Sequence, residues 1–437
     1  MKKSTRDSLT FGFALFAIFF GAGNLIFPPS IGLAAGDNWG AAMIGFVLTG
    51  IILPILGIIA VLNSEGKFEV LTNPISSWFY KFFNVLVMVG IGMTITIPRT
   101  AATTHELGIH ALFPQVPSIA TILVFFALNF YFAMDKSNFI DKVGKFLTPA
   151  LVAILLFIVV KGTFDPIKAP AATGLENPFS YSFINGYQTG DLLTGLLCAS
   201  IFFAAIVGKG YTEKADLRRI AVNGTVIAGL GLLVVYGGLL YLGATGSGVF
   251  PKDIDSTSLV IGLVDQLLGT YGTIALSVCV ALACLTTAIG LTAASADFLS
   301  QLTNHKISYR NFVIIISLAG IGVATLGVEK IIDYALPLFI GIYPVSIVLV
   351  FLGIFRKFIP NAGAYRGAVI VTMIISIFET LAMSGIEIKP VTQFISFIPL
   401  SASGFSWLIP SVIGFIVGTF IYKYGSSNKD KIENRAS

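Results

Sequence analysis

Long apolar runs recur along the whole chain, and short polar segments separate them. An apolar run of about 20 residues predicts a membrane-spanning helix, because a helix satisfies its own backbone hydrogen bonds within lipid. The pattern therefore predicts an all-α integral membrane protein with about 12 transmembrane helices. Their predicted limits are 9–35, 39–62, 76–112, 117–134, 138–161, 188–208, 217–243, 270–300, 312–327, 331–355, 367–384 and 404–424.

The composition excludes several classes of protein. Of the 437 residues, 55% are hydrophobic and only 11% are charged, whereas a soluble domain has about 25% charged residues. The net charge of +5 comes from short loops, so we expect it to report topology and not nucleic-acid binding. The chain has three His and no GxxxxGK[ST] motif, which disfavours a membrane enzyme and an ATP-driven pump. We expect a secondary transporter without a covalent cofactor.

The Lys and Arg residues predict the orientation. With both termini inside, 21 of the 27 Lys and Arg residues lie on the cytoplasmic side, as the positive-inside rule requires. The predicted location is the cell membrane, with both termini cytoplasmic and membrane lipid as the surroundings. The oligomeric state stays open. The external positions are Lys161, Lys168, Lys252, Lys330 and Lys389.

The order of the spans indicates an internal repeat. Spans 1–5 and 6–10 form two groups of five, and an odd number makes the second group enter from the opposite side. Such inverted repeats hold a site near the membrane midplane between their first helices, so we expect helices 1 and 6 to be discontinuous. The predicted units are 1–162 for the first repeat, 163–187 for an external loop, 188–356 for the second repeat, 357–424 for helices 11 and 12, and 425–437 for a cytoplasmic tail.

The first span contains the strongest candidate site. Its apolar run is interrupted by Gly21, Ala22, Gly23 and Asn24 and is followed by two prolines. Gly and Asn are poor helix formers, and the N–H and C=O groups freed by a break suit a carboxylate and a cation. Close helix packing is the alternative reading of the glycines. The centre of the sixth span, 194–203, shows a weaker break signal.

Two adjacent threonines mark the eighth span. Thr286 and Thr287 lie near its middle, and their hydroxyls either bond back to the helix or serve as ligands for a hard cation such as Na⁺. The centres of spans 1, 6 and 8 contain no charged side chain. Since a charged substrate would need a buried partner, this pattern favours a substrate with an apolar side chain.

The stretches GAGNLIFPP, ACLTTAIG and SIFFAAIVGKGY resemble the branched-chain amino acid:cation symporter family over essentially the whole chain. The same stretches are similar, more locally, to the leucine-transporter fold of neurotransmitter:sodium symporters. The resemblance implies sodium-driven import of leucine, isoleucine and valine by alternating access. A proton-coupled symporter of the same or another apolar amino acid remains the alternative.

The resemblance also implies roles for individual residues. The substrate would contact Ala22, Gly23, Asn24, Leu197, Ser200 and Phe203. A first sodium would use Phe19, Asn24 and Cys198, although sulfur is a poor ligand for a hard cation. A second sodium would use Ala17, Phe20, Ala283, Thr286 and Thr287.

Several ionisable residues fall within or beside spans. Arg99 and Glu106 are seven residues apart, so they share a helix face and predict an outer gate or a structural pair, unless the membrane ends before them. The resemblance implies proton coupling through Lys145, because some proton-coupled members of this fold have a lysine in the fifth span where sodium would otherwise bind. The alternative is a lysine whose ammonium reaches the interface. Glu379 predicts a buried residue with a polar partner, and we expect His105 and His110 to be solvated.

Overall fold

The computed structural model describes residues 3–21, 23–135, 139–211 and 213–436; the side chains of 3, 135–151, 201, 202, 205, 214 and 425–436 lie outside this description. Regular structure in the described ranges is helical throughout, as the apolar runs predict. The first part of the chain forms α1 (Lys3–Phe19), α2 (Gly23–Ala35), η1 (Gly36–Asn38), α3 (Trp39–Val47), η2 (Leu48–Ile52), α4 (Leu53–Asn63), α5 (Phe68–Thr72), α6 (Phe79–Val85), η3 (Leu86–Thr96), α7 (Ile97–Thr103), η4 (Thr104–His110), α8 (Ser118–Asp135) and α9 (Phe139–Phe164).

The second part continues the same pattern after a loop. Its helices are α10 (Pro178–Asn185), η5 (Gly186–Thr189), α11 (Asp191–Gly208), α12 (Lys214–Thr245), α13 (Ser256–Leu302), α14 (Tyr309–Ala324) and α15 (Val328–Ile354). The chain ends with η6 (Arg356–Phe358), α16 (Ala362–Met383), α17 (Lys389–Ser396), η7 (Ser401–Ser403) and α18 (Leu408–Ala436).

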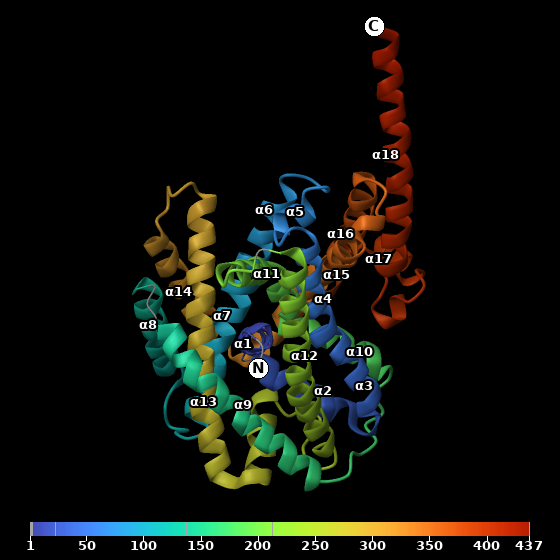
Figure 1. Ribbon diagram of the computed structural model, residues 1–437. Helices are drawn as coiled ribbons and strands as arrows, with labels where there is room; N and C mark the ends of the chain where they lie inside the picture. Colours follow the sequence, from blue (N-terminus) through green and yellow to red (C-terminus); the bar gives the residue numbers. More distant parts are fainter. Residues whose placement is uncertain (1–2, 22, 136–138, 212, 437) are drawn as a thin grey trace.

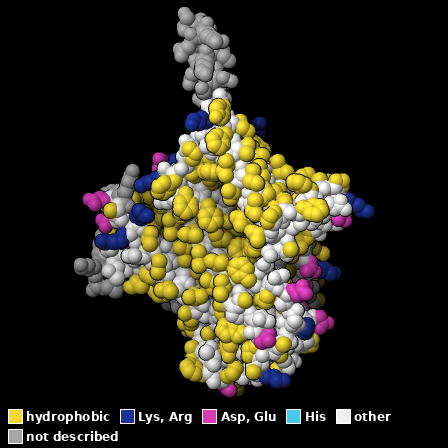
Figure 2. All heavy atoms as spheres, turned by 90° about the vertical axis from the view of Figure 1, so that its right-hand side faces the viewer, with side chains coloured by type: hydrophobic (Ala, Val, Ile, Leu, Met, Phe, Trp, Pro, Cys, Tyr) yellow, Lys and Arg dark blue, Asp and Glu magenta, His cyan; other side chains and the backbone are white. Residues whose placement is uncertain are grey.

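Six helices in the described part of the chain are long and apolar enough to cross a membrane, and five shorter apolar helices accompany them. Figure 2 shows one face of the molecule on which hydrophobic side chains fill a broad central area and charged side chains gather toward the margins. The prediction of an all-α membrane protein is therefore confirmed. The count of twelve spans and the boundaries of the two repeats stay predictions.

The third span is one continuous helical segment, Phe79–His110. Two π-helical stretches, η3 and η4, flank the short α-helical segment α7 within it. Since π-helical turns are rare and often occur at functional sites, this segment is a first structural pointer to one.

The break in the sixth span differs in position from the sequence prediction. Helix α11 runs without interruption through the predicted centre at 194–203. The chain turns instead at Gly190, which has φ +75° and separates α10 and η5 from α11. Only glycine adopts this left-handed conformation without steric cost. The predicted external loop 163–187 accordingly contains helix α10.

The two halves of the first span lie beside one helix. Both α1 and α2 pack along α12, as Figure 1 shows near the centre of the molecule. A Cβ atom on Gly32 would lie 1.9 Å from the Leu240 carbonyl oxygen, and one on Gly243 would lie 1.9 Å from the Pro29 carbonyl oxygen. These glycines therefore let the backbones of α2 and α12 approach closely.

A second glycine contact joins the two C-terminal helices, α16 and α18, which lie side by side in Figure 1. Gly363 and Gly367 on α16 face Gly414 and Gly418 on α18, so each helix presents a GxxxG pair. A Cβ atom on Gly367 would lie 1.9 Å from the Gly414 carbonyl oxygen. This contact leaves no space for a side chain.

We expect Gly367→Ala to destabilise the protein by about 1–3 kcal/mol, because the added methyl group forces α16 and α18 apart. The thermal unfolding midpoint of the purified protein measures this effect. The matched control is Gly322→Ala on α14, where an added Cβ meets no atom within 4 Å. Equal midpoints for the two variants would contradict the close α16–α18 contact.

Candidate functional site

The site begins at the break between α1 and α2. Helix α1 ends at Phe19, and the Gly21 amide donates to the Phe19 carbonyl at 3.0 Å instead of continuing the helical series. The amide of Asn24 then donates to the Gly21 carbonyl at 3.1 Å as α2 starts. The Ala17 carbonyl thereby loses the amide that a continuous helix would supply. The break predicted from the sequence is therefore present.

The Asn24 side chain connects this break to the break at Gly190. Its Nδ2 lies 3.0 Å from both carboxylate oxygens of Asp191, the first residue of α11, and 2.5 Å from the Phe19 carbonyl oxygen. The same Nδ2 also contacts the hydroxyl of Tyr236 on α12. Asn24, Asp191 and Tyr236 are all buried. The two discontinuous helices thus meet through an oxygen-rich cluster.

Tyr236 completes the cluster from α12. Its hydroxyl lies 3.3 Å from both the Phe19 carbonyl oxygen and Asp191 Oδ2. The side chain is fully buried, and its ring packs against Phe20 and Phe46. Burying an ionised carboxylate is costly unless hydrogen bonds or a positive charge compensate it. Asn24 and Tyr236 supply part of that compensation for Asp191.

Arg99 lies beside the same breaks and is only 2% exposed. Its Nη1 donates to the Gln188 carbonyl at 3.1 Å, and its guanidinium carbon lies 5.2 Å from the centre of the Phe27 ring. A Cβ on Gly23 would lie 2.7 Å from Arg99 Nη2. Arg99 therefore reaches the start of α2 from α7 and links it to the segment before Gly190.

A cavity of about 470 Å³ leads to this region. Phe27, which Arg99 touches, lines it together with Gln188, Ser30 and the acidic residues Glu329 and Asp333 of α15. The orientation predicted from the Lys and Arg residues puts this end of α15 on the external side. Phe27 and Gln188 both line the cavity and contact Arg99, so the cavity reaches the neighbours of Arg99.

The carboxylate of Glu106 makes hydrogen bonds to two other helices. Its carboxylate accepts from the Val328 amide at 2.9 Å and from the Thr257 hydroxyl at 2.8 Å, so it ties η4 to the starts of α15 and α13. Arg99 is buried and Glu106 is partly buried, and the described contacts give them different neighbours. His105 is buried with Nδ1 3.1 Å from the Thr121 hydroxyl, which corrects the expectation that it is solvated.

The other predicted residues have the following positions. Thr286 and Thr287 on α13 both donate to the Ala283 carbonyl at 2.9 Å. This is the back-bonding that the sequence left as one of two readings. A hydroxyl that donates in this way still has oxygen lone pairs for a cation. Ala22 and the side chain of Lys145 lie outside the described residues, so the roles predicted for them stay predictions.

The residues predicted from the sixth span lie away from its break. Leu197, Cys198, Ser200 and Phe203 belong to the uninterrupted helix α11. Phe203 packs against Gly66, where an added Cβ would lie 2.5 Å from its ring. Gly66 lies in the connection between α4 and α5, which the Lys and Arg pattern puts on the cytoplasmic side. The substrate contact predicted for Phe203 stays a prediction.

Sequence reasoning missed Asp191 and Tyr236. The stretch 194–203 contains no charged side chain, as the sequence shows, but the break at Gly190 brings the buried Asp191, which precedes that stretch, into the site. The segment Tyr187-Gln188-Thr189-Gly190-Asp191 carried the signal: it is polar, contains a glycine and precedes a long apolar run. Tyr236 has no such signal, because a single Tyr in an apolar helix is common in protein cores.

The family model described as "Branched-chain amino acid transport protein" matches residues 4–424. The chain belongs to this family of branched-chain amino acid transport proteins. It is 33% identical over 422 residues to the branched-chain amino acid permease BraB of Bacillus subtilis, covering 94% of this chain and 95% of the relative. It is also 33% identical over 417 residues to the branched-chain amino acid transport system 2 carrier protein of Pseudomonas aeruginosa, with 94% and 95% covered.

Solved structures show the fold. The chain is similar to MhsT in complex with L-phenylalanine, with a TM-score of 0.56, 16% identity, and 93% of this chain and 97% of the other covered. It is also similar to the inward-facing conformation of Mhp1, with a TM-score of 0.56, 16% identity, and 95% and 91% covered. The predicted leucine-transporter fold is confirmed.

We expect Gly23→Ala to lower leucine uptake by at least about tenfold, a loss of ~1.4 kcal/mol in binding, because the new Cβ displaces the Arg99 guanidinium. Radiolabelled leucine uptake into proteoliposomes measures this loss. Gly21→Ala is the matched control, because a Cβ at Gly21 meets nothing within 4 Å. If Gly23→Ala takes up leucine as well as Gly21→Ala does, leucine uptake does not depend on the close contact between Gly23 and the Arg99 guanidinium.

Proposed function

We propose that this protein imports branched-chain amino acids across the cell membrane by sodium symport and alternating access. The observation that carries the proposal is the meeting of two helix breaks at a buried Arg99, Asp191 and Asn24. Breaks of this kind supply free backbone dipoles for charged groups inside a membrane. Family membership supports an amino acid with a branched apolar side chain as the substrate.

The substrate carboxylate would bind at the start of α2. The amide of Gly23 lies at a helix N-terminus, where backbone N–H groups attract anions. The Arg99 guanidinium lies directly beside it and has five N–H donors, which suit a carboxylate. An amino acid zwitterion bound there would bring its negative end to the buried Arg99 and its positive end toward the Asp191 side of the breaks.

The coupling cation would bind in the oxygen cluster around Asn24. Four oxygens lie within hydrogen-bond distance of Asn24 Nδ2: those of Phe19, Tyr236 and the Asp191 carboxylate. An amide nitrogen has two hydrogens, so the oxygens outnumber the donors. Turning the amide over would add its own Oδ1 to an oxygen-rich site, and such sites suit a hard cation.

Asp191 takes the role in the first sodium site that Cys198 filled in the sequence prediction. A carboxylate is a better ligand for Na⁺ than a thiol, because hard cations prefer oxygen. The second site at Ala17, Phe20, Ala283, Thr286 and Thr287 remains part of the proposal. A buried carboxylate can also carry a proton, so proton coupling through Asp191 is the alternative mechanism.

We expect Asp191→Asn to abolish leucine uptake driven by a sodium gradient, because Asn keeps the size but removes the negative charge. Uptake into proteoliposomes under a sodium gradient alone and a proton gradient alone is the measurement. Asp265→Asn, an exposed position on α13, is the control. Unchanged sodium-driven uptake in Asp191→Asn would exclude Asp191 as a cation ligand. If a proton gradient alone drives uptake by the wild type, the coupling ion is H⁺ and the proposal of sodium symport fails.

The second cation site has its own test. We expect Thr286→Ala or Thr287→Val to raise the sodium concentration for half-maximal uptake at least about threefold, a loss of ~0.6 kcal/mol, because each removes one hydroxyl ligand. Thr286→Ser retains the hydroxyl and serves as the control. A sodium titration that superimposes on that of the wild type would remove these threonines from the site.

A further inference from the structure

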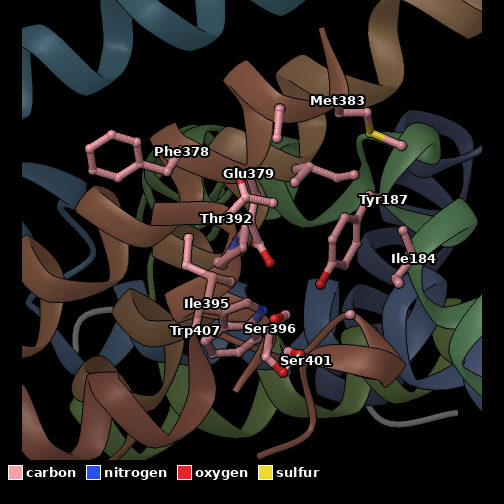
Figure 3. Close-up of a pocket in the computed structure, with 14 residues that line it drawn as sticks. Ile184, Tyr187, Phe378, Glu379, Met383, Thr392, Ile395, Ser396, Ser401 and Trp407 are labelled. Carbon is pink, nitrogen blue, oxygen red and sulfur yellow. Dashed lines mark hydrogen bonds between the residues drawn. The ribbon is translucent and has the colours of Figure 1, made fainter. Parts of the chain in front are cut away.

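A second cavity lies outside the site described above. It has a volume of about 300 Å³ and lies among α10, η5, α15, α16, α17, η7 and the segment that precedes α18. Figure 3 shows its interior, with Glu379, Tyr187 and Trp407 around one hollow. Its size is at the lower end of the range for small-molecule sites, about 300–1,000 Å³.

The polar groups of this cavity are incompletely satisfied. Glu379 accepts a hydrogen bond from the Ser406 hydroxyl. Tyr187 Oη and Trp407 Nε1 are near enough for a weak mutual hydrogen bond of poor geometry. Neither atom has another hydrogen-bond partner among the described residues. Both residues are almost completely buried, at 2% and 4% exposed. Buried polar groups nearly always have partners, so this cavity offers one anionic acceptor and two donors to a ligand.

Three hydroxyl side chains, those of Thr392, Ser396 and Ser401, also line the cavity, and each donates to a backbone carbonyl. The rest of the wall is apolar. Ile184, Ile340, Ile395 and Met383 line the cavity with aliphatic surface. A carboxylate suits an ammonium group, an indole N–H and a phenol O–H suit a carboxylate, and the aliphatic wall suits a branched side chain. These three features together match one class of ligand, a free α-amino acid with an apolar side chain.

This cavity adjoins both the 470 Å³ cavity and the site around Arg99. Met383 lines this cavity and also the 470 Å³ cavity that leads to Arg99. Tyr187 stacks on Tyr343 of α15 with ring centres 4.5 Å apart, and it directly precedes Gln188, whose carbonyl accepts from Arg99. A ligand here would contact the same short segment that forms one side of the central site.

We propose that the Glu379 cavity is a second binding site for a branched-chain amino acid, with its ammonium group at Glu379 and its carboxylate at Trp407 and Tyr187. The choice of this amino acid rests on the proposed function; the site itself rests on the cavity. Occupation of this site would stabilise one arrangement of η5 and so regulate transport at Arg99.

The test counts bound leucine on the purified full-length protein by equilibrium dialysis with radiolabelled leucine. We expect the wild type to bind a second equivalent that Glu379→Gln loses, and Trp407→Phe to weaken this second binding about tenfold, ~1.4 kcal/mol. Glu387→Gln is the control, because Glu387 is exposed nearby. The melting temperature of each variant shows whether it is folded.

The variant Gly23→Ala separates this inference from the proposed function. If Gly23→Ala loses one equivalent and Glu379→Gln the other, both proposals stand. If only Glu379→Gln loses binding, the Glu379 cavity is a leucine site and the substrate site proposed at Gly23 and Arg99 fails. If only Gly23→Ala loses binding, the cavity holds water or lipid and the inference is overturned.

Two analogues test the assignment of the polar groups. Isopentylamine retains the ammonium group of leucine without its carboxylate, and 4-methylpentanoate retains the carboxylate without the ammonium group. We expect neither analogue to displace the second leucine at the concentration at which valine does, because each leaves one set of polar groups unpaired. Displacement by isopentylamine as effective as by valine would show that Trp407 and Tyr187 do not bind a carboxylate.

Discussion

A backbone that is broken within a membrane must find hydrogen-bond partners inside the protein, because lipid supplies none. The two breaks meet this requirement with side chains from distant helices. The Phe19 carbonyl accepts from Asn24 and Tyr236, and the Gln188 carbonyl accepts from Arg99. Those side chains in turn need partners, which brings Asp191 into the cluster. The polar centre is therefore a consequence of breaking the two helices.

This dependence explains the packing around the centre. The helices that carry the breaks must be held closely enough for short polar side chains to reach across. Gly32 and Gly243 bring α2 and α12 into backbone contact, and α12 is the helix that supplies Tyr236. Tight apolar packing and the buried polar cluster thus support one another, since each fixes the position of the other.

The sequence predicted the class of protein, the break in the first span and the family, because each depends on a local pattern. Apolar run length predicts spanning helices, and the GAGN segment predicts the first break from the residues alone. The position of the second break could not be predicted in the same way, because Gly190 precedes the apolar run and looks like a loop residue. The burial of Arg99 depends on contacts with Gln188 and Phe27 that are distant in the sequence.

The hydroxyls of Thr286 and Thr287 illustrate a different limit. Their sequence positions predict two oxygens at mid-span, and the structure adds that both donate to one carbonyl. Hydrogen bonds of this kind are compatible with packing and with cation binding alike. The residue types therefore determine which atoms are available. Whether the two hydroxyls serve packing or cation binding depends on how near the carbonyls of the first span lie to them.

The π-helical stretches on either side of α7 have a consequence for Arg99. A π-helical turn contains more residues than an α-helical turn, so each stretch shifts the angular position of the residues that follow it. In an α-helix one residue corresponds to a rotation of about 100°. Deleting a single residue from η3 would turn Arg99 away from Gly23 by roughly that angle. Arg99 is the only charged residue in α7. The direction of its side chain therefore depends on the number of residues in the π-helical stretch η3, which precedes it.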